Sequence, residues 1–315
     1  MNYRHAYHAG NFADVLKHVV LHALLESLRA KPTPFALIDT HAGSGRYALD
    51  GAEASRTGEW RDGIGRLLFP DLHDGEATDA PLPPLLRHWL DGILAAPGNE
   101  HGLKVYPGSP LQAAAAMREG DGAYLCELQP DEAARLRALF RRDRRVHVHA
   151  RDGYTALKAL LPPREKRGLV LIDPPYEAQE AEYDILGKAL KDALQRWPGG
   201  IYAVWYPVKL RSQVQPFLRG LRHSGARRVL RAELLLHPDD TPLRLNGSGM
   251  AILNAPWQLD AALRESLRAL ARLLAQERAA HWTLDWLLEE GADARAPARP
   301  PPAPAASAGP LRRRR

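Results

Sequence analysis

The strongest constraint on the fold is a short apolar run that two prolines cut off. Residues 169–172 read Leu-Val-Leu-Ile, and Asp173, Pro174, Pro175 and Tyr176 follow directly. Proline has no N–H to give to a sheet, so a central strand has to end at Asp173. In open α/β sheets this carboxyl end is the edge where ligands bind. The block therefore predicts a buried strand that presents a carboxylate and a rigid turn at a binding edge.

Other short apolar runs alternate with helical patterns along the chain. We expect strands at 35–38, 124–127, 146–149, 201–206, 228–236, 250–253 and 281–287, and helices at 14–28, 130–140, 154–161 and 261–274. Such alternation is typical of parallel βαβ units in a doubly wound sheet. The pattern predicts an α/β fold with a mostly parallel sheet.

A glycine-containing turn follows the first expected strand. Gly43 and Gly45 allow a tight turn and a close approach to a ligand, although a plain turn is the alternative. The third glycine of a dinucleotide fingerprint is missing. A ribose-binding carboxylate is expected about 20 residues further on. Glu127 ends the next expected strand, but it lies 82 residues after Gly45.

The excess of about 60 residues over this spacing matches the Pro-, Gly- and acid-rich stretch 47–108, which has helical patterns near 58–68 and 84–94. We therefore predict four parts: an N-terminal segment with the start of the core (1–46), an inserted helical subdomain (47–108), the remainder of the core (109–289) and a disordered tail (290–315). The alternative interpretation of Glu127 is a solvated carboxylate at the end of a strand. Asp152 and Gly153 end the third strand, either as an adenine contact or as a simple turn.

Charge and cysteine content narrow the function classes. The formal net charge is +6, and Arg312–Arg315 supply four of these charges, so a phosphate-binding face must come from local clustering. The arginine tail either adds RNA affinity or is an inert solubilising extension. Cys126 is the single cysteine, which excludes an intramolecular disulfide and a thiolate metal cluster. We expect a cytoplasmic protein without a signal peptide or membrane span.

The Asp-Pro-Pro-Tyr block suits methyl transfer to an amino group on a base. The amino nitrogen of adenine is a poor nucleophile, and acceptors such as Asp173 and the Pro174 carbonyl favour its reactive form. Tyr176 could stack on an extruded base, whereas a structural turn with a packed tyrosine is the alternative. We interpret Asn254–Trp257 as a structural turn. His147 and His149 share a strand face, but no third ligand follows at a fixed spacing, so no metal is predicted.

Taken together, the chain over about residues 1–290 resembles the bacterial 23S ribosomal RNA adenine-N6 methyltransferases of the RlmJ type. The resemblance rests on the blocks Tyr3–Asn11, Ala13–His18, Asp39–Tyr47, Tyr106–Pro110, Asp173–Tyr176 and Trp205–Pro207. It implies a Rossmann-like class I methyltransferase core with an inserted helical subdomain. The family usually has Asn-Pro-Pro-Trp where this chain has Asn254-Ala-Pro-Trp257, and the tail is not part of its pattern.

The resemblance also implies roles for individual residues. Asp173 would accept the hydrogen bond or proton of the target amine. Tyr3 would contact the RNA or gate the pocket, and Pro174 and Tyr176 would face the RNA. The residues implied to bind the cofactor S-adenosylmethionine are His18, His41, Ser109, Glu127, Asp152 and Gly153. The implied partner is 23S ribosomal RNA, and we expect a monomer without a metal.

Three other functions remain open at this stage. The nearest is a DNA adenine-N6 or cytosine-N4 methyltransferase, because an Asp-Pro-Pro-Tyr block serves amino groups on either base. A non-enzymatic RNA-binding protein is disfavoured by the intact Asp173 and Glu127. A nicotinamide-dependent dehydrogenase is disfavoured by the missing third glycine.

Overall fold

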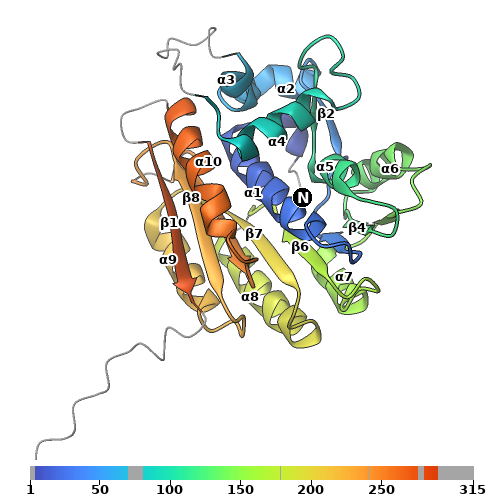
Figure 1. The fold of residues 1–315 in the computed structure, drawn as a ribbon. Coiled ribbons are helices and arrows are strands. Elements are labelled where there is room, and N and C mark those ends of the chain that lie inside the picture. The colour runs from blue at the N-terminus through green and yellow to red at the C-terminus, as the bar shows by residue number, and fades with distance from the viewer. Residues whose placement is uncertain (1–3, 70–80, 178, 241, 276–279, 290–315) are drawn as a thin grey trace, which may run out of the picture.

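The computed structural model describes residues 4–69, 81–177, 179–240, 242–275 and 280–289 (Figure 1). Tyr3 and the expected tail at 290–315 lie outside these residues. The main sheet contains β1 (Ala36–Asp39), β4 (Gly122–Cys126), β5 (Val146–His149), β6 (Gly168–Ile172), β7 (Ile201–Val208), β8 (Val229–Leu235), β9 (Gly247–Leu253) and β10 (His281–Leu288). Their order across the sheet is β10-β8-β9-β7-β6-β1-β4-β5.

The sheet divides into a parallel and an antiparallel part. Strands β5, β4, β1, β6 and β7 run parallel to one another, whereas β9 pairs antiparallel with β7 and β8, and β10 pairs antiparallel with β8. No described helix separates β8 from β9, so this pair can be antiparallel without a crossover. The predicted α/β fold with parallel βαβ units is confirmed, and all its parallel strands end at one edge.

Helices cover both faces of the sheet (Figure 1). One face carries α1 (Phe12–Arg29), α5 (Ser109–Ala116), α6 (Pro130–Leu139) and α10 (Leu259–Leu273), and the other carries α7 (Gly153–Leu160), α8 (Gln179–Arg196) and α9 (Arg211–Leu221). Neighbouring strand residues point to opposite faces: Leu37 and Leu171 join the first core cluster, and Ile38 and Ile172 join the second. Burial on both faces explains why these strands read as continuous apolar runs.

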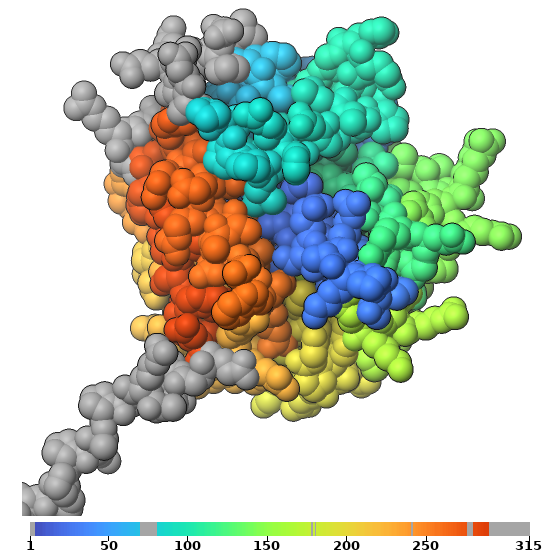
Figure 2. Space-filling view, in the orientation of Figure 1, coloured from blue at the N-terminus to red at the C-terminus, as the bar shows by residue number. Residues whose placement is uncertain are grey.

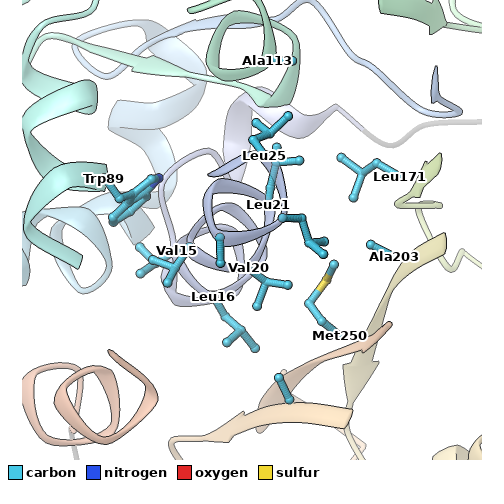
Figure 3. Close-up of a cluster of buried hydrophobic side chains, with 14 of the residues drawn as sticks. Val15, Leu16, Val20, Leu21, Leu25, Trp89, Ala113, Leu171, Ala203 and Met250 are labelled. Carbon is cyan, nitrogen blue, oxygen red and sulfur yellow. The ribbon is translucent and has the colours of Figure 1, made fainter. Parts of the chain in front are cut away.

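Helix α1 lies at the centre of the larger core cluster. Thirteen of its eighteen residues are buried, and Figure 3 shows Leu171, Ala203 and Met250 of the sheet on one side of it and Trp89 on another. The helix begins after Asn11, whose side chain accepts hydrogen bonds from the N–H groups of Ala13 and Asp14. Because α1 is enclosed on several sides, polar side chains on it are forced to find partners inside the protein.

The stretch between β1 and β4 contains a helical excursion. It holds α2 (Ala52–Thr57), η2 (Glu59–Arg61), α3 (Ile64–Leu68) and α4 (Pro84–Leu94), which gather at the top of Figure 1. A two-stranded ribbon of β2 (Arg46–Ala48) and β3 (Val105–Pro107) brackets these helices. The chain therefore leaves and returns at one place, which supports our proposal of an insertion at 47–108. A further short helix, η1 (His5–Tyr7), precedes α1.

None of the described helices is long and apolar enough to cross a membrane.

Candidate active site

A cavity of about 400 Å³ opens at the edge where β1, β4, β5 and β6 end. Its volume falls within the range of small-molecule sites. Its lining includes Asp173 and all six residues expected at the cofactor: His18, His41, Ser109, Glu127, Asp152 and Gly153. These residues come from widely separated parts of the sequence. We call this space the cofactor cavity.

Glu127 follows β4 and is held by backbone groups. Its Oε2 accepts the N–H of Gly43 at 2.8 Å, and its Oε1 accepts the N–H of Gln129 at 2.7 Å. Burial raises the pKa of this carboxyl above its ordinary value, against the opposing effect of these N–H groups. The carboxylate is thus fixed in orientation at the cavity wall, and each oxygen keeps a second lone pair for a ligand.

Two glycines let the backbone close around this cavity. Gly43 has a φ of +61°, and a Cβ there would collide with the hydroxyl of Tyr47. Gly153 is the first residue of α7, and a Cβ there would collide with the backbone of Thr40. Asp152 caps α7 by accepting the N–H of Thr155 at 2.7 Å. The glycines therefore allow close packing of turns at the cavity, as expected for Gly43 from the sequence.

The end of β1 carries a buried carboxylate that sequence reasoning did not single out. Asp39 is fully buried, and it accepts the hydroxyl of Ser109 at 2.7 Å and the N–H of His41 at 3.1 Å. Burial raises the pKa of Asp39 to about 6. Ser109 was expected to contact the cofactor, and the structure shows that its hydroxyl is donated to Asp39. Asp39 thereby ties β1 to the start of α5 and orients two cavity residues.

His18 of α1 reaches the same cavity from below the sheet edge. It is 1% exposed, its Nδ1 lies 2.7 Å from the hydroxyl of Tyr106, and its Nε2 has no partner among the described residues. Burial lowers the pKa of His18 to about 3, and burial likewise lowers that of His41 to about 4. Both imidazoles are therefore neutral at physiological pH. A buried nitrogen without a partner at a cavity wall indicates a place for a ligand polar group.

Asp173 is tied to α1 by an ion pair that the sequence did not predict. The ammonium of Lys17 lies 2.5 Å from Oδ2 of Asp173 and 2.6 Å from Oδ1 of Asp14. Asp14 also accepts from Nε2 of His5 at 2.8 Å and from the N–H of Gly10 at 2.9 Å. Burial opposes the charge on Lys17, but Asp14 and Asp173 together raise its pKa above the ordinary value. Asp14 and Lys17 lie one helical turn apart in a helix whose buried residues are mostly apolar, and this pairing is the signal that could have identified them.

The same pairing affects Asp14. Burial alone would raise the pKa of its carboxyl, but the charges of His5 and Lys17 hold the pKa well below the ordinary value. One oxygen of Asp173, Oδ1, accepts no hydrogen bond within the described part of the chain. Lys17 thus fixes one side of the Asp173 carboxylate and leaves the other side open.

A second cavity of about 480 Å³ lies on the other side of Asp173. Four residues line both cavities: His5, Lys17, Asp173 and Pro175. The second cavity is otherwise lined by the start of α1, by Glu59 and Asp62 of the excursion, and by residues after β6 and at the end of β7, including Trp205 within β7 and Lys209 just after it. Asp173 therefore stands on the wall between two spaces.

Tyr176 and Pro174 occupy different positions from those that a simple stacking role suggests. Tyr176 lines the second cavity but is only 7% exposed, and its hydroxyl donates to the carbonyl of Trp205 at 2.7 Å. Its φ is +50°, which points to a tightly held turn. Pro174 is buried and lines neither cavity, whereas Pro175 lines both. Tyr176, Pro175 and Trp205 thus form part of the wall of the second cavity.

The remaining sequence candidates lie elsewhere. Asn254 follows β9, which runs antiparallel to β7, so the Asn254–Trp257 turn is at the opposite sheet edge. The Asn254 amide holds this turn by donating to the carbonyls of Pro198 and Gly200. Across the described residues, no cluster of three or more His, Cys, Asp or Glu side chains is arranged to hold a metal ion.

Known proteins are similar to this sequence over most of its length. Residues 32–288 match the family described as Ribosomal RNA large subunit methyltransferase D, RlmJ. The chain is 42% identical to the Ribosomal RNA large subunit methyltransferase J of Haemophilus influenzae and 41% identical to that of Escherichia coli. These alignments cover 85% of this chain and 92% and 91% of the two relatives.

A solved structure of a Legionella pneumophila protein superimposes with a TM-score of 0.77 at 35% identity. The superposition covers 88% of this chain and 98% of that protein. The fold is accordingly that of a Rossmann-like methyltransferase. The chain belongs to the RlmJ family of ribosomal RNA large subunit methyltransferases.

Proposed function

We propose that this protein transfers a methyl group from S-adenosylmethionine to the exocyclic N6 of an adenine in 23S ribosomal RNA. The observation that carries the proposal is the position of Asp173 on the wall between two cavities. A methyl donor on one side and an amine on the other would then meet at a single carboxylate. Membership of the RlmJ family supports ribosomal RNA as the substrate.

The cofactor cavity fits S-adenosylmethionine by size and by its polar groups. Glu127 stands at the end of β4, where a carboxylate can accept both ribose hydroxyls. Asp152 and Gly153 at the start of α7 are suited to contact the adenine ring. The unpartnered Nε2 of His18 and the neutral ring of His41 offer contacts for the methionine portion. When bound, this cofactor supplies an electrophilic methyl group on a sulfonium.

The residues of the chain would activate and position the amine. Oδ1 of Asp173 is open to accept an N6–H of the target adenine, while Lys17 holds Oδ2 at 2.5 Å and prevents rotation of the carboxylate. Accepting that hydrogen bond localises the lone pair of N6, and Asp173 can take the proton that leaves as the new C–N bond forms. Tyr176, Pro175 and Trp205 would confine the base. Holding the reacting atoms in line supplies much of the acceleration.

A DNA amino-methyltransferase is the alternative, because the same carboxylate can serve adenine N6 or cytosine N4. The family match favours RNA. The test is transfer of radioactive methyl from S-adenosylmethionine to 23S ribosomal RNA and to DNA, each with and without nuclease treatment. Mass analysis of the digested product should give N6-methyladenosine from RNA. Label in DNA alone, or on cytosine, would refute the proposal.

A further inference from the structure

One short segment beside the cofactor cavity is strongly basic. Residues 135–151 contain seven arginines and one acidic residue, Asp143, so the segment carries a formal charge of +6. The whole chain also has a formal charge of +6, of which Arg312–Arg315 supply four. The remainder, residues 1–134 and 152–311, therefore sums to −4. Residues 211–231 also carry a formal charge of +6, so what distinguishes residues 135–151 is their place next to the cofactor cavity and not their charge alone.

The fold places this segment along one margin of the sheet. It runs from α6 into β5, and β5 is an edge strand of the sheet. Figure 2 shows the green surface of this region at the right-hand rim, with extended side chains reaching into solvent. Arg135 and Arg145 are paired with Glu132 and Asp143. The other five are exposed and form no ion pair with a carboxylate of the described chain: Arg137, Arg141, Arg142, Arg144 and Arg151. We call these five residues the arginine edge.

The arginine edge is connected to the cofactor cavity but does not line it. Helix α6 begins directly after Leu128 and Gln129, and Arg151 directly precedes Asp152; these three neighbours all line the cavity. Strand β5 is separated from β6, which carries Asp173, by β1 and β4. Three strand spacings correspond to about 14 Å. A group bound at the arginine edge would therefore belong to a flanking part of the substrate and not to its reacting atoms.

We propose that the arginine edge binds the phosphate backbone of the RNA that flanks the target adenosine; this inference rests on the proposed function. Guanidinium groups bind phosphate oxygens in a two-pronged geometry and are weakly hydrated, so exposed unpaired arginines suit a polyanion. The five guanidinium groups together create a positive potential that attracts an approaching RNA to the edge. Such contacts carry no base recognition and act on affinity and register.

The test compares two variants with the same change in charge. The edge variant replaces Arg137, Arg141, Arg142 and Arg144 by Gln. The control variant replaces four exposed arginines near the opposite margin of the sheet by Gln: Arg219, Arg222, Arg227 and Arg264. Binding of a short RNA hairpin is measured by fluorescence anisotropy at several salt concentrations, and methylation of 23S ribosomal RNA is measured in parallel. Melting temperatures and S-adenosylmethionine affinity check that both variants remain folded.

Each phosphate contact adds about 0.7–0.9 to the salt slope, so the edge variant should show a slope lower by about 3 and RNA affinity at least about tenfold weaker. Its KM for RNA should rise while kcat at saturating RNA stays unchanged. The control variant should stay close to the wild type. Equal behaviour of the two variants, whether both bind normally or both bind weakly, would overturn the inference. Failure of the proposed function would be seen separately, as absence of N6-methyladenosine with the wild-type protein.

Discussion

The two cavities that meet at Asp173 are built in different ways. The cofactor cavity is formed largely by residues that follow the parallel strands β1, β4, β5 and β6. The second cavity combines the start of α1, the helical excursion and residues at the end of β7 and after it. In the first, most polar groups other than those of α1 and the segment before it follow a strand and are positioned by it. In the second, the groups come from segments that only tertiary packing brings together.

The two cavities therefore depend on different kinds of sequence information. A strand followed by a glycine turn or a carboxylate places a side chain at the sheet edge by local rules. The second cavity depends on buried electrostatics, since Lys17 joins α1 to the Asp173 turn across the core. Lys17 lines both cavities, so a substitution of Lys17 is the strongest test of how the two cavities are joined.

The largest expected effect is on Lys17. Lys17→Met removes the cation between Asp14 and Asp173, whose side chains are 2% and 16% exposed. Breaking a buried ion pair by removing one partner costs about 3–5 kcal/mol of the free energy of unfolding. Urea denaturation at neutral pH measures this loss. Lys17→Arg keeps the charge and should recover part of the stability. A loss in Lys17→Met below about 1 kcal/mol, the value of an exposed pair, would show that the two cavities are not joined through Lys17.

The next largest effect concerns Asp173, which lies on the wall between the two cavities. Asp173→Ala should lower the rate of methyl transfer by about 100-fold or more, which corresponds to about 2.7 kcal/mol, because the acceptor for the N6–H is lost. Affinity for S-adenosylmethionine, measured by calorimetry, should change by only a few-fold, since the other cofactor-cavity residues remain. Asp173→Asn serves as a control that keeps the shape of the side chain. A rate within a few-fold of wild type would exclude the proposed role.

Glu127 tests the cofactor cavity alone. Glu127→Ala should weaken S-adenosylmethionine binding by about 1.5–3 kcal/mol, the range for a hydrogen bond to a charged group. RNA affinity measured without cofactor should not change, because Glu127 lines the first cavity and not the second. Glu127→Gln keeps hydrogen-bonding capacity and should lie between the two. If RNA binding falls together with cofactor binding, the division into two cavities is wrong.

The same division explains how much the sequence could predict. The strands expected at 146–149 and 281–287 correspond to β5 and β10, and the expected helices at 14–28 and 261–274 correspond to α1 and α10. These segments have apolar patterns that local rules interpret. Helices α8 and α9 were not predicted; α9 even contains Pro216, a residue that argues against a helix interior. Packing against the sheet outweighs that local signal.

The candidate site divides in the same manner. The six residues expected at the cofactor line one cavity, since each lies in or beside a strand-end motif or the Ala13–His18 block. Their individual roles stay predictions. Lys17 and Asp39 were missed because their importance depends on partners distant in sequence, Asp173 for Lys17 and Ser109 for Asp39. A single sequence carries no direct record of such pairs.

The pKa values of His18 and His41 in the cofactor cavity and of His8 in the second cavity are shifted in opposite directions. In the cofactor cavity, burial lowers the pKa of His18 to about 3 and that of His41 to about 4. Below pH 6.5 the unfolded chain therefore binds protons at these two histidines, whereas the folded protein does not. Their contribution to the free energy of unfolding falls as the pH drops. In the second cavity, a hydrogen bond to Glu59 raises the pKa of His8 above 6.5. Its contribution is present below pH 6.5 and is lost as the pH rises through the raised pKa.

The smallest expected effect uses this contrast. Nδ1 of His8 lies 3.0 Å from both oxygens of Glu59, and the two side chains are 40% and 37% exposed, so solvent screens the pair. His8→Gln should cost about 0.2–1 kcal/mol of unfolding free energy at pH 5.5 and little of this at pH 9. Urea denaturation at the two pH values measures the difference, and Glu59→Gln should reproduce it because it removes the same pair. A cost in His8→Gln that is equal at both pH values, or larger at pH 9, would mean that this contact between the N-terminal segment and the excursion is not an ion pair. The proposed contrast in histidine pKa shifts between the two cavities would then have to be abandoned.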